Sequence, residues 1–256
     1  MSPDFLGLGA HKSGSTWLHE MLDQHPEIAL PPGKELHFWD RCWHEGSSLE
    51  GYEETFASLT KPIKGEITPA YAILPPPTIM VIRKSYPGLR LLYVLRDPIE
   101  RAWSHARMGF AKTFPDPAED DVSAHADWFL EHFRSVGSLA RGDYPRCIAN
   151  WEAAYPSGAM LTLLYDDMQT SPREFLRACC RHLGADPEFF DTLDTARLSA
   201  KIYPEKSILK SRSSTLPQKV PERFVAPLLD IYLPKVGALS AMLRRDLSTL
   251  WLSRYI

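Results

Sequence analysis

Short apolar runs alternate along this 256-residue chain with segments whose apolar residues have helical spacing. The clearest run, residues 89–95, is nearly continuous in apolar and β-favouring residues, which is typical of a parallel strand buried on both faces. Runs at 4–9 and 159–165 repeat this pattern, and shorter strands are expected at 28–30 and 64–69.

Helices are expected between these strands. The pattern predicts them at 15–24, around 78–85, from Pro98 onward, and at 172–183 with Gly184 closing the last. Strands that alternate with helices indicate an α/β fold, with a central parallel sheet flanked by helices. Because neither an internal repeat nor a linker is visible, we expect one domain over 1–256.

Two stretches depart from this pattern. Residues 113–126 are acidic and contain proline, so we expect an exposed loop or lid there. Residues 201–221 mix Lys, Arg, Ser and Pro with few apolar side chains, which predicts a long functional or mobile loop.

Composition narrows the class of protein. A net charge of −3 argues against a partner such as nucleic acid, which is held by broad basic surfaces. No apolar run approaches the roughly 20 residues of a transmembrane segment, and the N-terminus lacks the pattern of a secretory signal. The four cysteines lack zinc-site spacing, so no metal is expected, and adjacent Cys179 and Cys180 are expected to pack in a helix. We expect a cytoplasmic enzyme, or a domain cut from a larger protein.

The segment 5–18 combines a strand, a tight turn of small residues and the start of a helix. Unpaired N–H groups at a helix N-terminus, together with the helix dipole, make an anion cradle. Gly9 and Gly14 have P-loop spacing. A loop that binds a nucleotide triphosphate has a lysine directly after the second glycine, but here Ser15 occupies that position, and the lysine, Lys12, lies inside the loop. This pattern predicts a phosphate-bearing donor other than ATP with magnesium.

A second anion site is predicted after the central strand. Arg96 stands at the carboxyl end of that strand, where doubly wound sheets bind ligands, and Ser104 lies about two turns into the next helix. The arginine can clasp a phosphate through two N–H groups, and the serine hydroxyl adds a donor. In the alternative interpretation, Arg96 pairs with Asp97 or Glu100 and Ser104 is an ordinary helix serine.

Two motifs resemble those of sulfotransferases that use 3′-phosphoadenosine-5′-phosphosulfate (PAPS). Residues 12–17 (KSGSTW) resemble the 5′-phosphosulfate loop, and residues 96–104 (RDPIERAWS) resemble the 3′-phosphate motif, in the same order. The resemblance implies a P-loop NTPase-like sulfotransferase fold and no need for a metal. It implies that Lys12 stabilises charge on the departing nucleotide, and it assigns the 5′-phosphate to Ser13, Gly14, Ser15 and Thr16. Trp17 would stack near the adenine; in the alternative it is a core aromatic residue.

The segment 34–39 (KELHFW) resembles the Lys-Glu-x-x-Phe-Phe segment of carbohydrate sulfotransferases related to the heparan sulfate enzymes. There the glutamate is the general base, so the resemblance gives this role to Glu35. If the segment is extended, His37 projects to the same side and could orient Glu35 or share its proton. The alternatives are an ion pair of Glu35 with Lys12 or Lys34, and a packing role for His37.

Other segments give weaker assignments. Residues 65–71 (GEITPAY) resemble a Glu-Lys-Thr-Pro-x-Tyr segment that borders the acceptor cleft in the same group. Ile67 replaces the lysine of that segment, and this loss of a positive charge argues against a heparan-like acceptor. This segment gives Glu66, Thr68 and Tyr71 as acceptor candidates, with a structural strand-end role as the alternative. Residues 142–146 resemble the family segment that precedes a helix lining the acceptor pocket, and they add Tyr144 as a candidate. The loop over the adenine and 3′-phosphate would contribute Ser207, Lys210 and Arg212, unless these are solvated surface residues.

The sequence therefore predicts a sulfotransferase that moves the sulfuryl group of PAPS to a hydroxyl of a small-molecule or carbohydrate acceptor and releases adenosine 3′,5′-bisphosphate. A P-loop kinase of a small metabolite is the first alternative, and it would depend on magnesium. A non-catalytic nucleotide-binding module is the second; loss of Lys12 or Glu35 would favour it, and both are present. The sequence leaves open the acceptor, which could be a sugar, a lipid or a polyketide-like hydroxyl, and the oligomeric state.

Overall fold

A computed structural model describes residues 2–114, 117–118, 120–194, 197–198 and 213–256. The chain forms two compact units. Unit 1 comprises Met1–Leu95 and Ile148–Tyr203, and unit 2 comprises Arg96–Cys147 and Pro204–Ile256. The expectation of a single domain over 1–256 stays a prediction.

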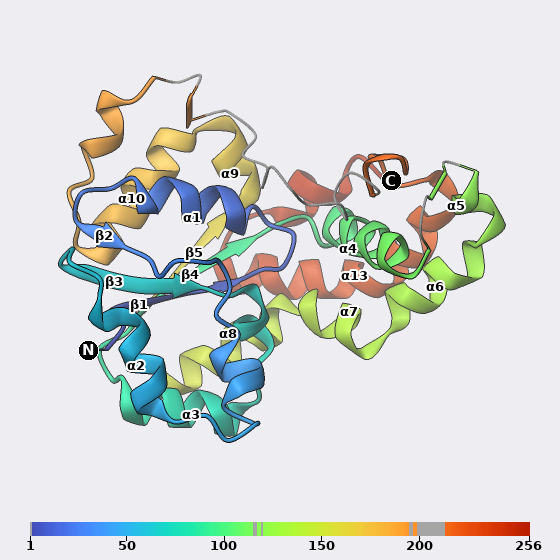
Figure 1. The fold of residues 1–256 in the computed structure, drawn as a ribbon. Coiled ribbons are helices and arrows are strands. Elements are labelled where there is room, and N and C mark those ends of the chain that lie inside the picture. The colour runs from blue at the N-terminus through green and yellow to red at the C-terminus, as the bar shows by residue number, and fades with distance from the viewer. Residues whose placement is uncertain (1, 115–116, 119, 195–196, 199–212) are drawn as a thin grey trace. The chain divides into compact units, whose positions relative to one another are not determined.

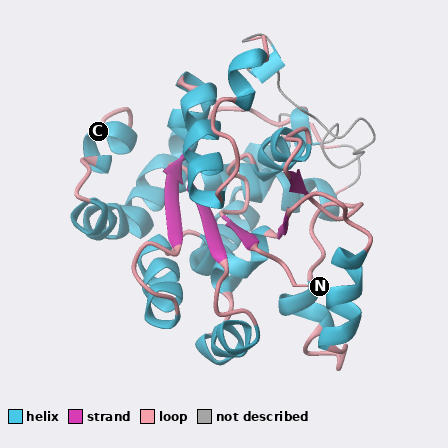
Figure 2. Cartoon of the chain, turned by 90° about the vertical axis from the view of Figure 1, so that its left-hand side faces the viewer, coloured by secondary structure: helices cyan, strands magenta, loops and turns pink. Residues whose placement is uncertain are grey.

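Unit 1 is built on a parallel sheet of five strands in the order β2-β3-β1-β4-β5. The strands are β1 (Phe5–Gly9), β2 (Ile28–Ala29), β3 (Ile63–Ile67), β4 (Arg90–Leu95) and β5 (Met160–Leu164). Figure 2 shows them enclosed among helices. The predicted α/β fold with a central parallel sheet is confirmed, and every strand lies within about two residues of its predicted range.

Helices cover both faces of this sheet (Figure 1). One face carries α1 (Ser15–Asp23), α9 (Tyr165–Thr170) and α10 (Pro172–Leu183), and the other carries α2 (Leu49–Ala57) and α3 (Pro76–Ser85). The apolar sides of α1 and α10 meet the sheet in one core, which includes Leu18, Leu22, Leu92, Leu176 and Cys179. Cys179 and Cys180 are buried there, as the helical spacing predicts, and α10 ends before Gly184.

The short elements of unit 1 include η1 (Phe38–Cys42), which has π-helical geometry, and the 3₁₀ turns η2 (Pro69–Ile73) and η3 (Phe189–Thr192). The sequence pattern does not predict η1. A π-helical turn is uncommon and occurs often at functional sites.

Unit 2 is helical in its described residues. It contains α4 (Pro98–Thr113), α5 (Asp121–Ala124), α6 (Ala126–Arg134), α7 (Val136–Arg141), α13 (Glu222–Leu243) and the π-helical η4 (Ser248–Leu252), and α8 (Tyr144–Ala154) starts in it and ends in unit 1. Its aromatic core joins α4, α6 and α13, because the ring of Trp103 lies 5.2 Å from Phe129 and 5.7 Å from Phe224 between centroids.

The expectation of an exposed loop over 113–126 is wrong in part. Helix α4 continues to Thr113, and α5 forms over 121–124. Val122 is buried, and the Asp121 carboxylate accepts a hydrogen bond of 2.7 Å from the Ala118 N–H at the start of this turn. A buried apolar side chain and a local hydrogen bond therefore outweigh the acidic composition. Of the second predicted loop, 201–221, residues 201–212 lie outside the described part.

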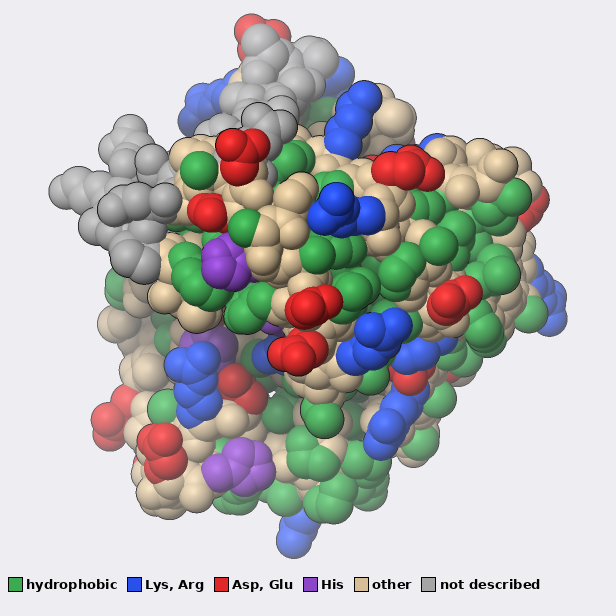
Figure 3. Space-filling model, turned by 90° about the vertical axis from the view of Figure 1, so that its right-hand side faces the viewer, with side chains coloured by type: hydrophobic (Ala, Val, Ile, Leu, Met, Phe, Trp, Pro, Cys, Tyr) green, Lys and Arg blue, Asp and Glu red, His purple; other side chains and the backbone are tan. Residues whose placement is uncertain are grey.

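Among the described helices, α13 is long and apolar enough to cross a membrane, judged by length and composition alone. This differs from the expectation that no segment reaches that length. A third of its apolar window is buried in the protein, and a core helix of a globular protein passes the same test. On the face seen in Figure 3, side chains of both charges are interspersed with apolar ones, a pattern unlike a broad basic surface.

Strands β1 and β3 approach each other closely at Gly65. A Cβ atom at this position would collide with the Phe5 ring and with the Phe5 carbonyl oxygen. Gly65→Ala should therefore lower the free energy of unfolding by about 1–3 kcal/mol through overpacking. Urea unfolding measures this change. Gly88→Ala is the matched control, because its Cβ would meet no atom within 4 Å; equal effects of the two substitutions would contradict the packing described here.

Candidate functional site

The loop between β1 and α1 has the backbone of an anion cradle. The Ala10 N–H donates to the Val94 carbonyl at 2.7 Å, which ties the start of the loop to β4. Lys12 and Gly14 have φ of 71° and 82°, in the left-handed region. No side chain caps the N-terminus of α1 at Gly14, so its first N–H groups are available to an anion.

Gly14 is required for two reasons. Its left-handed backbone favours glycine, and a Cβ there would collide with the Met168 methyl group and lie 3.2 Å from the Tyr165 ring. Tyr165 and Met168 belong to α9, directly after β5. Neither residue was among the candidates from sequence, although Tyr165 ends the predicted strand 159–165 and Met168 follows it, at the carboxyl ends of the strands where ligands bind.

The other loop residues differ in exposure. Lys12, Ser15 and Thr16 are half-buried, whereas Ser13 is only 1% exposed and its hydroxyl has no hydrogen-bond partner in the described chain. Trp17 is 8% exposed; its indole N–H donates to the Leu198 carbonyl at 2.9 Å, and its ring meets Phe175 edge-on. These contacts match the alternative interpretation of Trp17 as a core residue, and its adenine contact stays a prediction.

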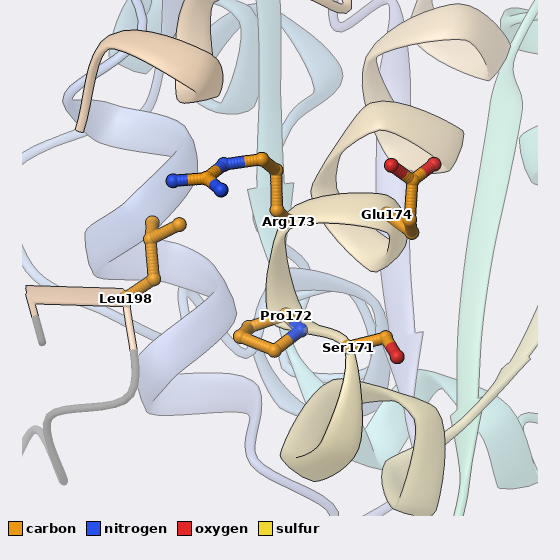
Figure 4. Close-up of a pocket in the computed structure, with 5 residues that line it drawn as sticks. All are labelled: Ser171, Pro172, Arg173, Glu174 and Leu198. Atoms are coloured by element: carbon orange, nitrogen blue, oxygen red, sulfur yellow. The ribbon is translucent and has the colours of Figure 1, made fainter. Parts of the chain in front are cut away.

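A small pocket adjoins Leu198. It has a volume of about 260 Å³ and is lined by Ser171, Pro172, Arg173, Glu174 and Leu198. In Figure 4, Arg173 extends toward the side on which Leu198 lies, and Glu174 points away. The guanidinium already donates to the carbonyls of Phe190 and Leu193 at 3.2 and 2.8 Å. The pocket is smaller than the roughly 300 Å³ at which small-molecule sites begin, so it does not form a complete donor site.

Glu35, His37 and Asp40 form a linked group of side chains. His37 Nε2 lies 3.4 Å from Glu35 Oε2, and His37 Nδ1 lies 2.9 Å from Asp40 Oδ2. Lys34 Nζ pairs with the second oxygen of Glu35. The three side chains are between 17% and 27% exposed, so they are partly shielded but reachable from solvent. Asp40 was not among the candidates from sequence. Its i,i+3 spacing from His37 could have predicted this contact, because residues three apart on a helical turn are neighbours.

The segment that carries these residues is not extended, so the condition under which Glu35 and His37 would project to the same side of a strand is not met. Glu35 and His37 have φ of 67° and 53°, and His37 is the residue that precedes η1. Two left-handed non-glycine residues cost about 1–3 kcal/mol each and persist where surrounding contacts hold them. The side chains of Glu35 and His37 meet because the backbone coils here. They do not meet because alternate residues of a strand share one side.

Glu66 supplies contacts that hold this coiled segment, residues 34–40, which is called the coil below. Its carboxylate accepts hydrogen bonds from the hydroxyls of Tyr52 at 2.7 Å, Thr68 at 2.7 Å and Tyr71 at 2.9 Å, and from the Leu36 N–H. The Tyr71 oxygen in turn accepts the N–H of Phe38 at 3.0 Å. Burial raises the pKa of Glu66 above its ordinary range, and these donors oppose that rise.

Three acceptor candidates are therefore interior residues of the described chain. Glu66, Thr68 and Tyr71 are no more than 2% exposed. Ile67, at the position of the family lysine, is also 2% exposed, and its side chain lies against Gly7 of β1. The structure gives Glu66, Thr68 and Tyr71 the strand-end role that was their alternative, and their contact with an acceptor stays a prediction.

The coil lies close to the helix that follows the donor loop. His19 of α1 is sensitive to the charges of Lys34 and Glu35. Burial is the main cause that lowers the pKa of His19. The carboxylates of Glu20 and Asp23 oppose this effect, and Glu35 opposes it least. Within unit 1, the base candidate and the first helix are thus electrostatic neighbours.

Unit 2 carries the second predicted anion site. Arg96 pairs with Glu100 at 3.0 Å, as its alternative interpretation predicts, and Ser104 is half-buried on α4. Tyr144 is 1% exposed, and its hydroxyl donates to the Arg96 carbonyl at 2.8 Å. Tyr144 therefore fixes the backbone of Arg96 in this structure, and its predicted acceptor contact stays a prediction.

The predicted two-phosphate clamp combines Lys12 of unit 1 with Arg96 and Ser104 of unit 2, and it stays a prediction. Ser207, Lys210 and Arg212, the candidates from the closing loop, lie outside the described residues.

Asp97 begins the helix of the second site and gives unit 2 a pH dependence. Its carboxylate accepts the N–H of Ile99 at 2.9 Å and the Tyr255 hydroxyl at 2.9 Å. Burial raises the pKa of Asp97 from its ordinary value of 3.8 to about 6, so the ionised carboxylate destabilises the fold above this pH and the penalty disappears as pH falls.

Asp97→Asn should remove this dependence. From about pH 7.5 to about pH 4, the free energy of unfolding of the native protein should rise relative to the variant by up to about 3 kcal/mol. Urea unfolding at each pH measures the difference. Asp230→Asn, at an exposed position of α13, is the control. A difference between native protein and Asp97→Asn that is constant over this range would refute the assignment.

Comparisons with known proteins agree with the fold and the motifs. The model of the sulfotransferase domain family matches residues 2–214. The structure of a sulfotransferase from Alicyclobacillus acidocaldarius superposes with a TM-score of 0.71 at 23% identity, covering 97% of this chain and 98% of that one. This likeness confirms the sulfotransferase fold.

Two curated relatives match over less than half of the chain. The membrane-associated sulfotransferase kil1 of Dictyostelium discoideum is 34% identical over 106 residues, which are 40% of this chain and 22% of that protein. Human heparan sulfate glucosamine 3-O-sulfotransferase 6 is 33% identical over 112 residues, 43% of this chain and 32% of that protein. The chain thus spans less than a third of the length of either relative. With the family model matched over most of its length, the chain belongs to the sulfotransferase domain family.

Proposed function

We propose that this domain transfers the sulfuryl group of PAPS to a hydroxyl of a small-molecule or carbohydrate acceptor, releasing adenosine 3′,5′-bisphosphate. The observation that carries the proposal is the contact of Glu35 with the His37–Asp40 pair, close to the helix that begins at the donor loop. A carboxylate held in this way is a suitable general base for a hydroxyl.

The donor loop supplies the electrostatic part of the reaction. The first N–H groups of α1, capped by no side chain, suit the 5′-phosphate, and Ser13 adds a buried hydroxyl. Lys12 would stabilise the negative charge that grows on the bridging oxygen as the sulfur–oxygen bond breaks. Because a sulfuryl group carries less charge than a phosphoryl group, one lysine inside the loop suffices where phosphoryl transfer needs a metal ion. This point disfavours the kinase alternative.

Glu35 would take the acceptor proton as the acceptor oxygen attacks the sulfur in line. The bond from this oxygen to sulfur forms while the bond from sulfur to the nucleotide breaks, and the proton ends on the Glu35 carboxylate. Asp40 accepts from one ring nitrogen of His37 and so directs the other toward Glu35. Lys34 holds the second Glu35 oxygen. These contacts fix the base in one orientation.

The proposed acceptor class rests on the residue at position 67. The heparan sulfate relative acts on a glucosamine of that polymer by its name, whereas Ile67 removes a cation from the matching segment here and is buried. We therefore propose an uncharged hydroxyl acceptor. We propose the cytoplasm as the location. The alternative is a location at a membrane, which is suggested by the name of the membrane-associated relative and by the apolar helix α13.

Glu35→Gln tests the mechanism. The amide keeps the size of the side chain but cannot take a proton at neutral pH, so turnover with labelled PAPS and an acceptor found by screening should fall at least about tenfold. Binding of adenosine 3′,5′-bisphosphate should be unchanged. Glu45→Gln, at an exposed position of the same segment, serves as the matched control. Full turnover of Glu35→Gln would exclude Glu35 as the base.

A further inference from the structure

The second anion site has a residue that the family motif does not include. On α4, Arg107 follows Ser104 by three residues, and such residues lie on the same face of a helix. Arg96 stands just before the first turn of the same helix. The role inferred below for Arg107 rests on the proposed use of PAPS, whose 3′-phosphate Arg96 and Ser104 would bind.

Arg107 is poorly satisfied by the described protein. Its Nη1 donates to the Ser213 carbonyl at 3.4 Å, which is a long bond, and its Nε is buried without a hydrogen-bond partner. Within the described ranges no carboxylate pairs with it. A guanidinium has five N–H donors, and leaving one of them buried and unpaired costs free energy.

The charges around Arg107 favour binding of an anion. Burial lowers the pKa of Arg107, and the positive charge of Arg96 lowers it further, so the two guanidinium groups are near enough to repel. The nearby carboxylate of Glu100 is already shared between Arg96 and Arg254, at 3.0 and 2.6 Å. A bound dianion would offset the repulsion and supply acceptors to both arginines.

We propose that Arg107 is a third ligand of the 3′-phosphate, together with Arg96 and Ser104. The ligand class is a phosphate monoester on the ribose of the donor. Arg107 then contributes to the choice of nucleotide, since its buried Nε gains an acceptor when the 3′-phosphate is present and has none in the described protein when the nucleotide lacks it.

Calorimetry with two nucleotides tests this role. Adenosine 3′,5′-bisphosphate and 5′-AMP share the base, ribose and 5′-phosphate and differ in the 3′-phosphate. Arg107→Met should weaken binding of the bisphosphate at least about tenfold, the size expected for a charged hydrogen bond, and leave 5′-AMP binding unchanged. Arg107→Lys should lie between, because it keeps the charge but loses the fork of donors. Lys112→Met, which removes an exposed cation from the same helix, should change neither affinity.

The outcomes separate the two proposals. If the native protein binds the bisphosphate no tighter than 5′-AMP, the proposed use of PAPS fails. If the native protein prefers the bisphosphate and Arg107→Met keeps this preference in full, PAPS use stands and the role of Arg107 is overturned. An equal loss for both nucleotides also overturns it, because it shows a structural effect of the substitution. Should Arg107→Met fail to fold, the Arg107→Lys ratio of the two affinities decides in the same way.

Discussion

The candidate site depends on one buried carboxylate. Glu66 is 2% exposed and accepts hydrogen bonds from three hydroxyls and from the Leu36 N–H. Such a group is costly to bury unless its oxygens are satisfied. Here the donors come from α2, from the end of β3, from η2 and from the coil that holds Glu35. Satisfying Glu66 therefore fixes the coil on the sheet, and it offsets the strain of the left-handed Glu35 and His37.

The same arrangement explains how the proposed base, Glu35, is held on an irregular segment. Phe38 and Trp39 are buried next to Tyr52, and the Phe38 and Tyr52 rings stack at 4.4 Å between centroids. Their burial anchors one end of the coil, and Glu66 anchors its middle through Leu36. The polar side chains of Glu35 and His37 are left partly exposed between these anchors. In the proposed mechanism, Glu66, Thr68 and Tyr71 would act on the reaction through the position of Glu35.

Much of the fold could be predicted from sequence because it follows from local pattern. The buried strands, the helix opening after Gly14 and the stop of α10 at Gly184 were predicted within a few residues. The anion-cradle backbone of the loop before α1 could be predicted because its small residues and the helix start are consecutive in sequence. What failed depended on contacts distant in sequence. The left-handed coil at Glu35 and His37 is imposed by Glu66, some thirty residues away; Arg107 stands out only through its unpaired Nε and the charge of Arg96. A helix formed at 121–124 because Val122 is buried, which composition does not show.

The central claim is that the loop at Lys12 and the motif at Arg96 serve a donor with a 3′-phosphate, and that magnesium is not needed to hold it. Calorimetry of the full chain with adenosine 3′,5′-bisphosphate and with ADP, both in the presence of a chelator, tests this claim most directly. The bisphosphate should bind at least about tenfold more tightly than ADP, because its 3′-phosphate gains charged hydrogen bonds that ADP cannot make. Equal or tighter binding of ADP would contradict the account and favour a phosphoryl-transfer site.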